Sequence, residues 1–173
     1  TLKIVFSFIE NSTTPLVLDA DALNCVAKQP EILLRKKAPI IITPHPGEMS
    51  RLTGLATPLV NAERERVALD FAQKYGVVTV LKGAGTVIAS PNGKVLVNPT
   101  GNSGMATGGS GDVLAGMTAS ILAQGASAFS SAAAAVYLHG LAGDIAAEKY
   151  GKISMLPTDL INCIPLAYKR CGF

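Results

Sequence analysis

The sequence of 173 residues contains no tryptophan, only two histidines and only three cysteines. Two histidines exclude a metal site built on several imidazoles. Cys25, Cys163 and Cys171 are odd in number and lack metal-binding spacing, so we interpret them as free thiols in a reducing compartment and expect a cytoplasmic protein. No apolar run reaches the roughly 18 residues that a membrane-spanning helix needs, so we expect no membrane partner.

Several familiar motifs are also missing. The sequence has no Gly-x-x-x-x-Gly-Lys-Ser/Thr phosphate loop, no Gly-x-Gly-x-x-Gly after a first strand and no Gly-x-Ser-x-Gly nucleophile elbow. The net charge of +3 is modest, and no basic run is interleaved with aromatic residues. A nucleic-acid partner is therefore not indicated.

Short apolar runs that alternate with helical patterns predict an α/β protein, with residues 1–173 forming a single domain. We expect strands at 16–18, 40–42 and 77–81, and a hairpin of 86–89 and 95–97 around Asn92-Gly93. Helices are expected at 20–28, 48–52, 61–75, 111–124, 128–149 and 156–170. Continuously apolar strands favour a mostly parallel sheet that helices cover on both faces. Asn61 is the expected N-cap of its helix, and Pro165 should kink or break the last one.

The stretch from Asn98 to Asp112 is glycine-rich and leads directly into an apolar helix. Glycine lets backbone N–H groups approach an anion closely, and a helix N-terminus adds unpaired N–H groups and a positive dipole end. This pattern favours a cradle for a phosphoryl group over an ordinary turn. Asp112 lies where it could take a proton from the group that attacks the phosphate.

Three further polar segments follow expected strands, and ligands of such sheets bind beyond the carboxyl ends of the strands. Asp19 and Asp21 either cap the next helix or hold Mg²⁺ through water. His45, between two prolines, is either a loop histidine bonded to backbone or a ligand contact. Lys82 is either a solvated turn lysine or a phosphate contact. His139 is interpreted as a packing residue and is left out of the site.

Four segments in this order and spacing resemble the ADP- or ATP-dependent NAD(P)H-hydrate dehydratases, a branch of the ribokinase-like fold, over about residues 15–165. The segments are 19–24 (Asp-Ala-Asp-Ala-Leu-Asn), 43–48 (Thr-Pro-His-Pro-Gly-Glu), 82–86 (Lys-Gly-Ala-Gly-Thr) and 98–116. Members of the family carry an N-terminal segment that this chain lacks. We therefore expect residues 1–173 to be the C-terminal part of a ribokinase-like domain whose N-terminal strands are missing.

The resemblance implies that a nucleotide phosphorylates the ring hydroxyl of (S)-NAD(P)H hydrate and that loss of phosphate restores NAD(P)H. Asp112 would be the catalytic base, and the substrate would contact His45 and Asp112. Asn102, a neighbour of this site, is also predicted to contact the substrate. The residues implied for nucleotide and phosphate binding are Lys82, Gly83, Ala84, Gly85, Thr86, Thr107, Gly108, Gly109, Ser110 and Gly111.

The implied cofactor is Mg²⁺, with ADP or ATP as co-substrate. The implied partners are a fused or separate NAD(P)H-hydrate epimerase and further copies of the chain in a homo-oligomer. Two alternatives stay open: a ribokinase-like kinase for a small vitamin precursor, and a nucleotide-binding protein without catalysis.

Overall fold

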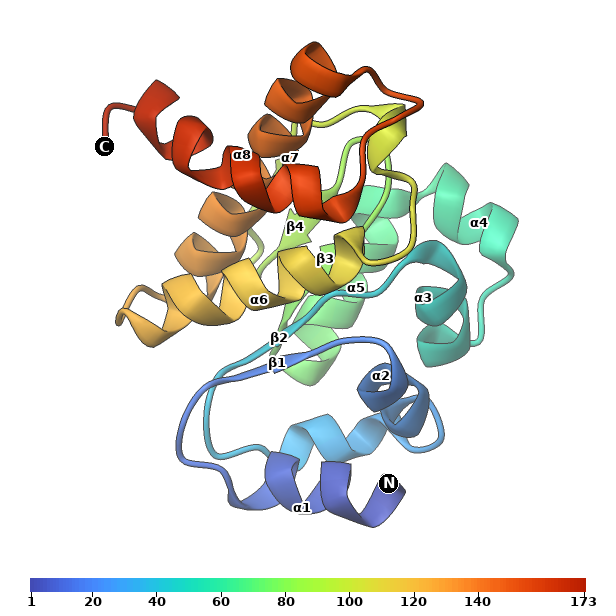
Figure 1. The fold of residues 1–173 in the computed structure, drawn as a ribbon. Helices are drawn as coiled ribbons and strands as arrows, with labels where there is room; N and C mark the ends of the chain where they lie inside the picture. Colours follow the sequence, from blue (N-terminus) through green and yellow to red (C-terminus); the bar gives the residue numbers. More distant parts are fainter.

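The computed structural model describes residues 1–173 and is an α/β structure built on one five-stranded sheet (Figure 1). The strands, in sheet order, are β1 (Leu16–Leu18), β2 (Ile40–Ile42), β3 (Val78–Leu81), β4 (Val87–Ala89) and β5 (Val95–Val97). β1, β2 and β3 pair in parallel, whereas β3, β4 and β5 pair antiparallel. The expected strands and the hairpin are thus confirmed within a residue or two.

Helices cover both faces of the sheet, as the apolar strands predicted. The helices are α1 (Leu2–Asn11), α2 (Asp21–Val26), α3 (Pro46–Thr53), α4 (Thr57–Ala62), α5 (Arg64–Tyr75), α6 (Ser110–Ala123), α7 (Ala128–Tyr150) and α8 (Pro157–Arg170), with short 3₁₀ helices η1 (Pro30–Arg35) and η2 (Ser103–Met105). Figure 1 shows α6, α7 and α8 gathered on one side of the strands and α1 with α2 on the other. None of the helices is both long enough and apolar enough to cross a membrane.

The alternation of side chains along β2 divides the core in two. Ile40 and Ile42 belong to a cluster with α1, α2, η1, α3 and α5, whereas Ile41 belongs to a second cluster with α6, α7 and α8. All three isoleucines are at most 1% exposed. Because successive strand side chains point to opposite faces, one apolar run serves both clusters. The helices on both sides hold the strand ends, and with them the site, at fixed positions.

The helix expected at 61–75 was wrong in detail, and of the kink or break expected at Pro165 the break is absent. The single helix expected at 61–75 is divided at Glu63, where φ is −124° and ψ is 43°, and Asn61 lies inside α4 instead of capping α5. α8 continues unbroken through Pro165. Pro165 cannot donate to the carbonyl of Ile161, but Ile161 is 48% exposed, so water can replace the missing bond.

Candidate active site

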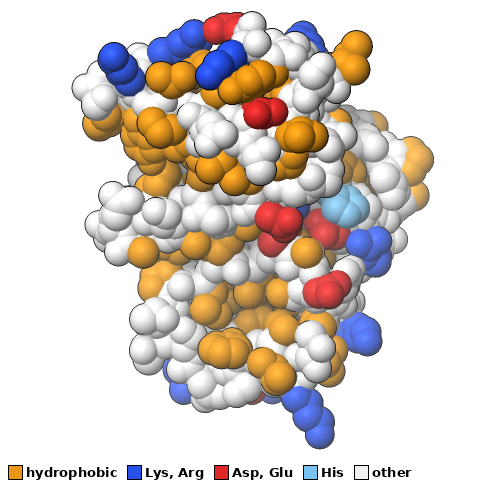
Figure 2. All heavy atoms as spheres, in the orientation of Figure 1, with side chains coloured by type: hydrophobic (Ala, Val, Ile, Leu, Met, Phe, Trp, Pro, Cys, Tyr) orange, Lys and Arg blue, Asp and Glu red, His pale blue; other side chains and the backbone are white.

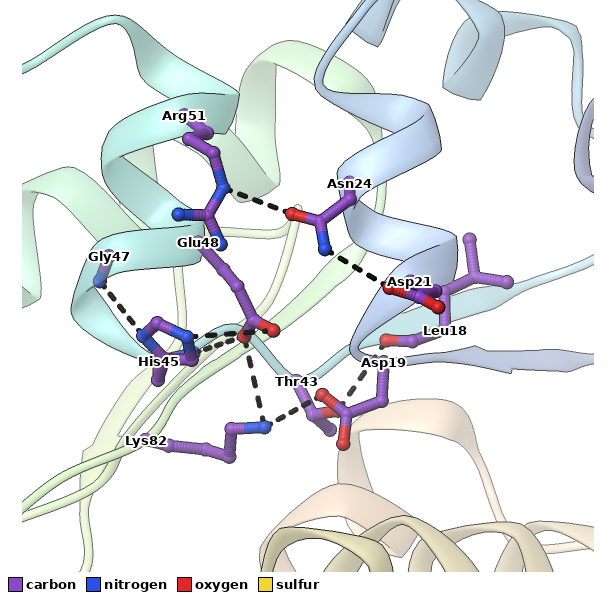
Figure 3. A network of polar contacts seen from close by, with 10 residues as sticks. All are labelled: Leu18, Asp19, Asp21, Asn24, Thr43, His45, Gly47, Glu48, Arg51 and Lys82. Carbon is purple, nitrogen blue, oxygen red and sulfur yellow. Dashed lines mark hydrogen bonds and ion pairs between the residues drawn. The ribbon is translucent and has the colours of Figure 1, made fainter. Parts of the chain in front are cut away.

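Polar residues from the ends of β1, β2 and β3 meet at one edge of the sheet (Figure 3). Lys82, which directly follows β3, places Nζ 2.7 Å from Oδ1 of Asp19, which directly follows β1. The backbone N–H of Lys82 donates to the carbonyl of Pro44, beyond the end of β2, at 2.8 Å. Both ends of the ion pair are mostly buried, with side chains 20% and 13% exposed. The convergence expected from the strand ends is therefore confirmed.

Glu48 connects this ion pair to the histidine loop. Its Oε2 lies 3.9 Å from Nζ of Lys82 and accepts a hydrogen bond from the backbone N–H of His45 at 2.8 Å. The Glu48 side chain is only 7% exposed. A buried carboxylate needs such partners, because an unpaired charge away from water is costly. Glu48 therefore joins the loop after β2 to the lysine after β3.

His45 is the N-cap of α3, and its Nδ1 accepts a hydrogen bond from the backbone N–H of Gly47 at 3.0 Å. The interpretation of His45 as a loop histidine bonded to backbone is thus confirmed. Because Nδ1 accepts, the neutral ring carries its hydrogen on Nε2, which lies 3.7 Å from Oε1 of Glu48. The side chain is 52% exposed, so its outer edge remains free to contact a ligand.

Neither aspartate after β1 caps the next helix. α2 has no side-chain cap, and Asp19 pairs with Lys82, while Asp21 accepts a long 3.4 Å hydrogen bond from Asn24. No three histidine, cysteine, aspartate or glutamate side chains come together as a metal site. Between the aspartates, Ala20 has φ 48°, the only positive φ outside glycine. Such backbone strain is typical of functional turns.

The glycine-rich loop ends at Gly109, the N-cap of α6, and Asp112 lies in the first turn of that helix. A Cβ on Gly111 would lie 3.5 Å from Nζ of Lys82 and 3.9 Å from Oδ2 of Asp19. The start of α6, with its unpaired N–H groups, therefore lies directly against the ion pair. The chain makes no side-chain hydrogen bond or ion pair to the exposed Asp112.

Figure 2 shows acidic, basic and histidine side chains gathered at mid-height on one face, where the strand ends lie in Figure 1. A cavity of about 640 Å³ is lined by residues 82–86, by residues of the glycine-rich segment 98–116 and by three residues of α7. Its lining includes eight of the expected site residues: Lys82, Gly83, Ala84, Gly85, Thr86, Asn102, Ser110 and Gly111. His45, Thr107, Gly108, Gly109 and Asp112 do not line it. The structure thus brings the expected nucleotide loop and the start of α6 to one cavity.

His139, on α7, also borders this cavity, although it was left out of the expected site. Its side chain is buried, and Nε2–H donates to the carbonyl of Ser110 at 2.9 Å. The interpretation as a hydrogen-bonded packing residue is confirmed. The Ser110 hydroxyl oxygen, by contrast, is buried without any partner. An unsatisfied hydroxyl at the start of a helix fits an anion that the protein alone does not supply.

We expect His139 to make the stability depend on pH. Burial lowers the pKa of His139 from 6.5 to about 4. Between these values the unfolded chain binds the proton and the folded chain does not, so stability is complete above the unfolded pKa and falls as the pH drops toward the folded one. At about 1.4 kcal/mol per pH unit, the loss amounts to about 3 kcal/mol.

Urea unfolding between about pH 7 and about pH 4.5 measures this loss. His139→Gln stays neutral and keeps an N–H donor for Ser110, so it should show a shallower decline than the parent protein. An equal decline in both proteins would assign the pH dependence to other groups.

The comparisons with known proteins agree with this geometry. A family model described as NAD(P)H-hydrate dehydratase matches residues 1–166. The chain belongs to the NAD(P)H-hydrate dehydratase family. The bifunctional NAD(P)H-hydrate repair enzyme Nnr of Moorella thermoacetica is 44% identical over 98% of this chain and 32% of its own length. The ADP-dependent (S)-NAD(P)H-hydrate dehydratase of Neisseria meningitidis is 44% identical over 82% of this chain and 49% of its own length.

A solved structure of a dehydratase gives the same result. The ADP/ATP-dependent NAD(P)H-hydrate dehydratase of Bacillus subtilis, co-crystallised with ATP and Mg²⁺, superposes with a TM-score of 0.85 at 36% identity. The match covers 94% of this chain and 57% of that one. The fold is ribokinase-like, as expected. The chain spans about a third to somewhat over half the length of these dehydratase relatives.

Proposed function

We propose that the protein containing this chain dehydrates (S)-NAD(P)H hydrate to NAD(P)H at the expense of ADP or ATP. The observation that carries the proposal is the start of α6. The first turn of α6 begins beside the Lys82–Asp19 ion pair and borders the cavity through Ser110 and Gly111. The same turn carries Asp112, whose carboxylate makes no hydrogen bond or ion pair within the chain. Family membership supports the substrate, because the matched relatives are named for this reaction.

In the proposed reaction, Asp112 removes the proton of the ring hydroxyl, whose oxygen then bonds to the terminal phosphorus of the nucleotide. The bond from that phosphorus to the leaving phosphate oxygen breaks, which releases AMP from ADP, or ADP from ATP. The phosphorylated carbon then loses inorganic phosphate, and loss of one ring proton restores the double bond. We assign stabilisation of the charge on the transferring group to the backbone N–H groups at residues 108–111, of which that of Ser110 also donates to the carbonyl of Thr107 at 3.3 Å.

The other expected site residues are assigned to binding the nucleotide or the hydrate. Lys82–Thr86 binds the nucleotide, together with Thr107 and the residues at the start of α6. His45 contacts the hydrate from the far side of Glu48 through its exposed ring edge. Both Nδ2 hydrogens of Asn102 and one acceptor position of its Oδ1 are used within the chain. We infer that Asn102 contributes the shape of the cavity wall.

Mg²⁺ is proposed to arrive with the nucleotide. The chain offers no three-residue metal site, but Mg²⁺ commonly binds through substrate phosphates and one or two carboxylates. Oδ2 of Asp19, which makes no hydrogen bond within the chain and faces Gly111, fits that role. The ion would neutralise charge on the phosphates. An epimerase, fused or separate, and a homo-oligomeric state remain predictions.

The test is the absorbance of the reduced nicotinamide, recorded with hydrated NADH or NADPH, Mg²⁺ and either ADP or ATP. The full-length protein should give a nucleotide-dependent rise, and the faster nucleotide identifies the donor. Accumulation of a phosphorylated alcohol in a screen of vitamin precursors, without this rise, would indicate a kinase. Nucleotide binding without any turnover would indicate a non-catalytic protein.

A further inference from the structure

The cavity has one wall with almost no regular structure of its own. Residues 98–106, which we call the wall loop, join β5 to the segment before α6 and contain only the short η2. All of these residues except Gly104 line the cavity. The expected nucleotide loop, 82–86, also lines the cavity, and its Thr86 carbonyl accepts from the backbone N–H of Asn98 at 2.9 Å. The shape of the cavity therefore depends on what holds the wall loop in place.

The wall loop packs directly on the backbone of α7. Thr100 Oγ1 donates to the carbonyl of Tyr137 at 2.9 Å. A Cβ on Gly140 would lie 2.1 Å from Thr100 Oγ1, and a Cβ on Gly143 would lie 2.3 Å from Sδ of Met105. Two glycines one turn apart thus let the loop approach the helix more closely than any side chain would allow.

Asp144, the next residue of α7, ties the loop to the helix with both carboxylate oxygens. Oδ2 accepts from the backbone N–H of Gly101 at 2.9 Å, and Oδ1 accepts from Nδ2 of Asn102 at 3.0 Å. Asp144 has no ion-pair partner within 4 Å among the residues of the chain. Hydrogen bonds to an ionised group are about twice as strong as neutral ones. The carboxylate is therefore committed to the wall loop.

Asn102 connects α7 to the part of the wall loop that follows it. Its Nδ2 also donates to the carbonyl of Gly143 at 3.0 Å, and its Oδ1 accepts from the backbone N–H of Gly104 at 3.0 Å. The side chain thus bridges α7 and the start of η2. Loss of the carboxylate of Asp144 would leave two donors, on Gly101 and Asn102, without their acceptor.

We propose that Asp144 is a positioning residue for nucleotide binding. It does not line the cavity, and it acts by holding Gly101 and Asn102 so that the wall loop faces residues 82–86 at the right distance. This inference rests on the proposed function, in which that cavity takes ADP or ATP. Asp144 has no contact with Asp112, so the chemical step should continue once nucleotide is bound.

Asp144→Ala tests the inference in the full-length protein. We expect the Kd for ADP or ATP, measured by calorimetry, to rise about tenfold or more, since two charge-assisted hydrogen bonds are lost. The kcat at saturating nucleotide should stay within about threefold of the parent value, because Asp112 and the start of α6 are unchanged. Hydrogen exchange of the Gly101 amide should accelerate, since it loses its acceptor.

Glu148→Ala is the matched control. Glu148 lies one turn further along α7 and pairs with Arg170 at 2.7 Å, so this variant removes the same charge without touching the loop. It should leave the Kd and the Gly101 exchange unchanged. Asp144→Asn keeps one acceptor oxygen, but its amide N–H would face Nδ2 of Asn102, which is also a donor. Its Kd should therefore lie between those of the parent protein and Asp144→Ala.

A parental Kd in Asp144→Ala, or an equal rise in Glu148→Ala, would overturn the positioning role. The nucleotide Kd and the hydrogen exchange of Gly101 can both be measured without turnover, so they test the positioning role separately from the proposed function. A protein that binds nucleotide but dehydrates no hydrate would refute the proposed function, while a raised Kd in Asp144→Ala would still support the positioning role. If Asp144→Ala binds nucleotide with the parental Kd and still dehydrates the hydrate, only the positioning role would be refuted.

Discussion

Asp112→Asn is expected to lower kcat for dehydration by about 10²–10⁴, the range that a positioned general base contributes. The carboxylate lies in the first turn of α6 and is exposed. Asparagine has nearly the same shape but cannot take the hydroxyl proton. Because the side chain has no partner within the chain, its replacement should leave the fold and the melting temperature almost unchanged.

The nucleotide Kd should also change little, because the backbone N–H groups and Lys82 remain. Asp70→Asn, at an exposed position of α5, is the control for loss of one negative charge. Steady-state rates and calorimetric binding on the same preparations separate catalysis from binding. Near-parental kcat in Asp112→Asn would remove the residue from its proposed role, and another group would then have to accept the proton.

Lys82→Met is expected to remove about 3 kcal/mol of unfolding free energy and to weaken nucleotide binding strongly. Methionine keeps most of the apolar stem but leaves Asp19 and Glu48 as mostly buried carboxylates without their cation. Breaking a buried ion pair from one side typically costs about 3–5 kcal/mol. We use the lower end because both members of the Lys82–Asp19 pair retain some contact with water.

A second substitution identifies the cause. Asp19→Asn in the Lys82→Met background removes one of the carboxylate charges left without a cation. It should recover part of the lost unfolding free energy, measured by urea unfolding. Lys94→Met, in the exposed hairpin turn, controls for the loss of a lysine and should be nearly neutral. No recovery in the double variant would show that the carboxylates are not the source of the instability.

The strand ends could be predicted because burial leaves a local signature. Ile40–Ile42 is apolar at every position because both of its faces are covered, and Asn92-Gly93 supplies the turn that joins β4 to β5. The same reasoning failed for the helix expected at 61–75. The break at Glu63 leaves no mark in the apolar periodicity of that segment.

The sequence by itself determined the family, the order of the strands along the chain, the glycine-rich start of α6 and the position of Asp112 in its first turn. These features depend on neighbours within a few residues, whose propensities and spacing can be recognised in the sequence alone. Only the tertiary structure decided which polar groups meet. Asp19 pairs with Lys82 across 63 residues of chain, and Asp144 holds Gly101 and Asn102. A carboxylate looks the same in sequence whether it caps, pairs or anchors, because its role is set by the donors that packing brings within hydrogen-bond distance.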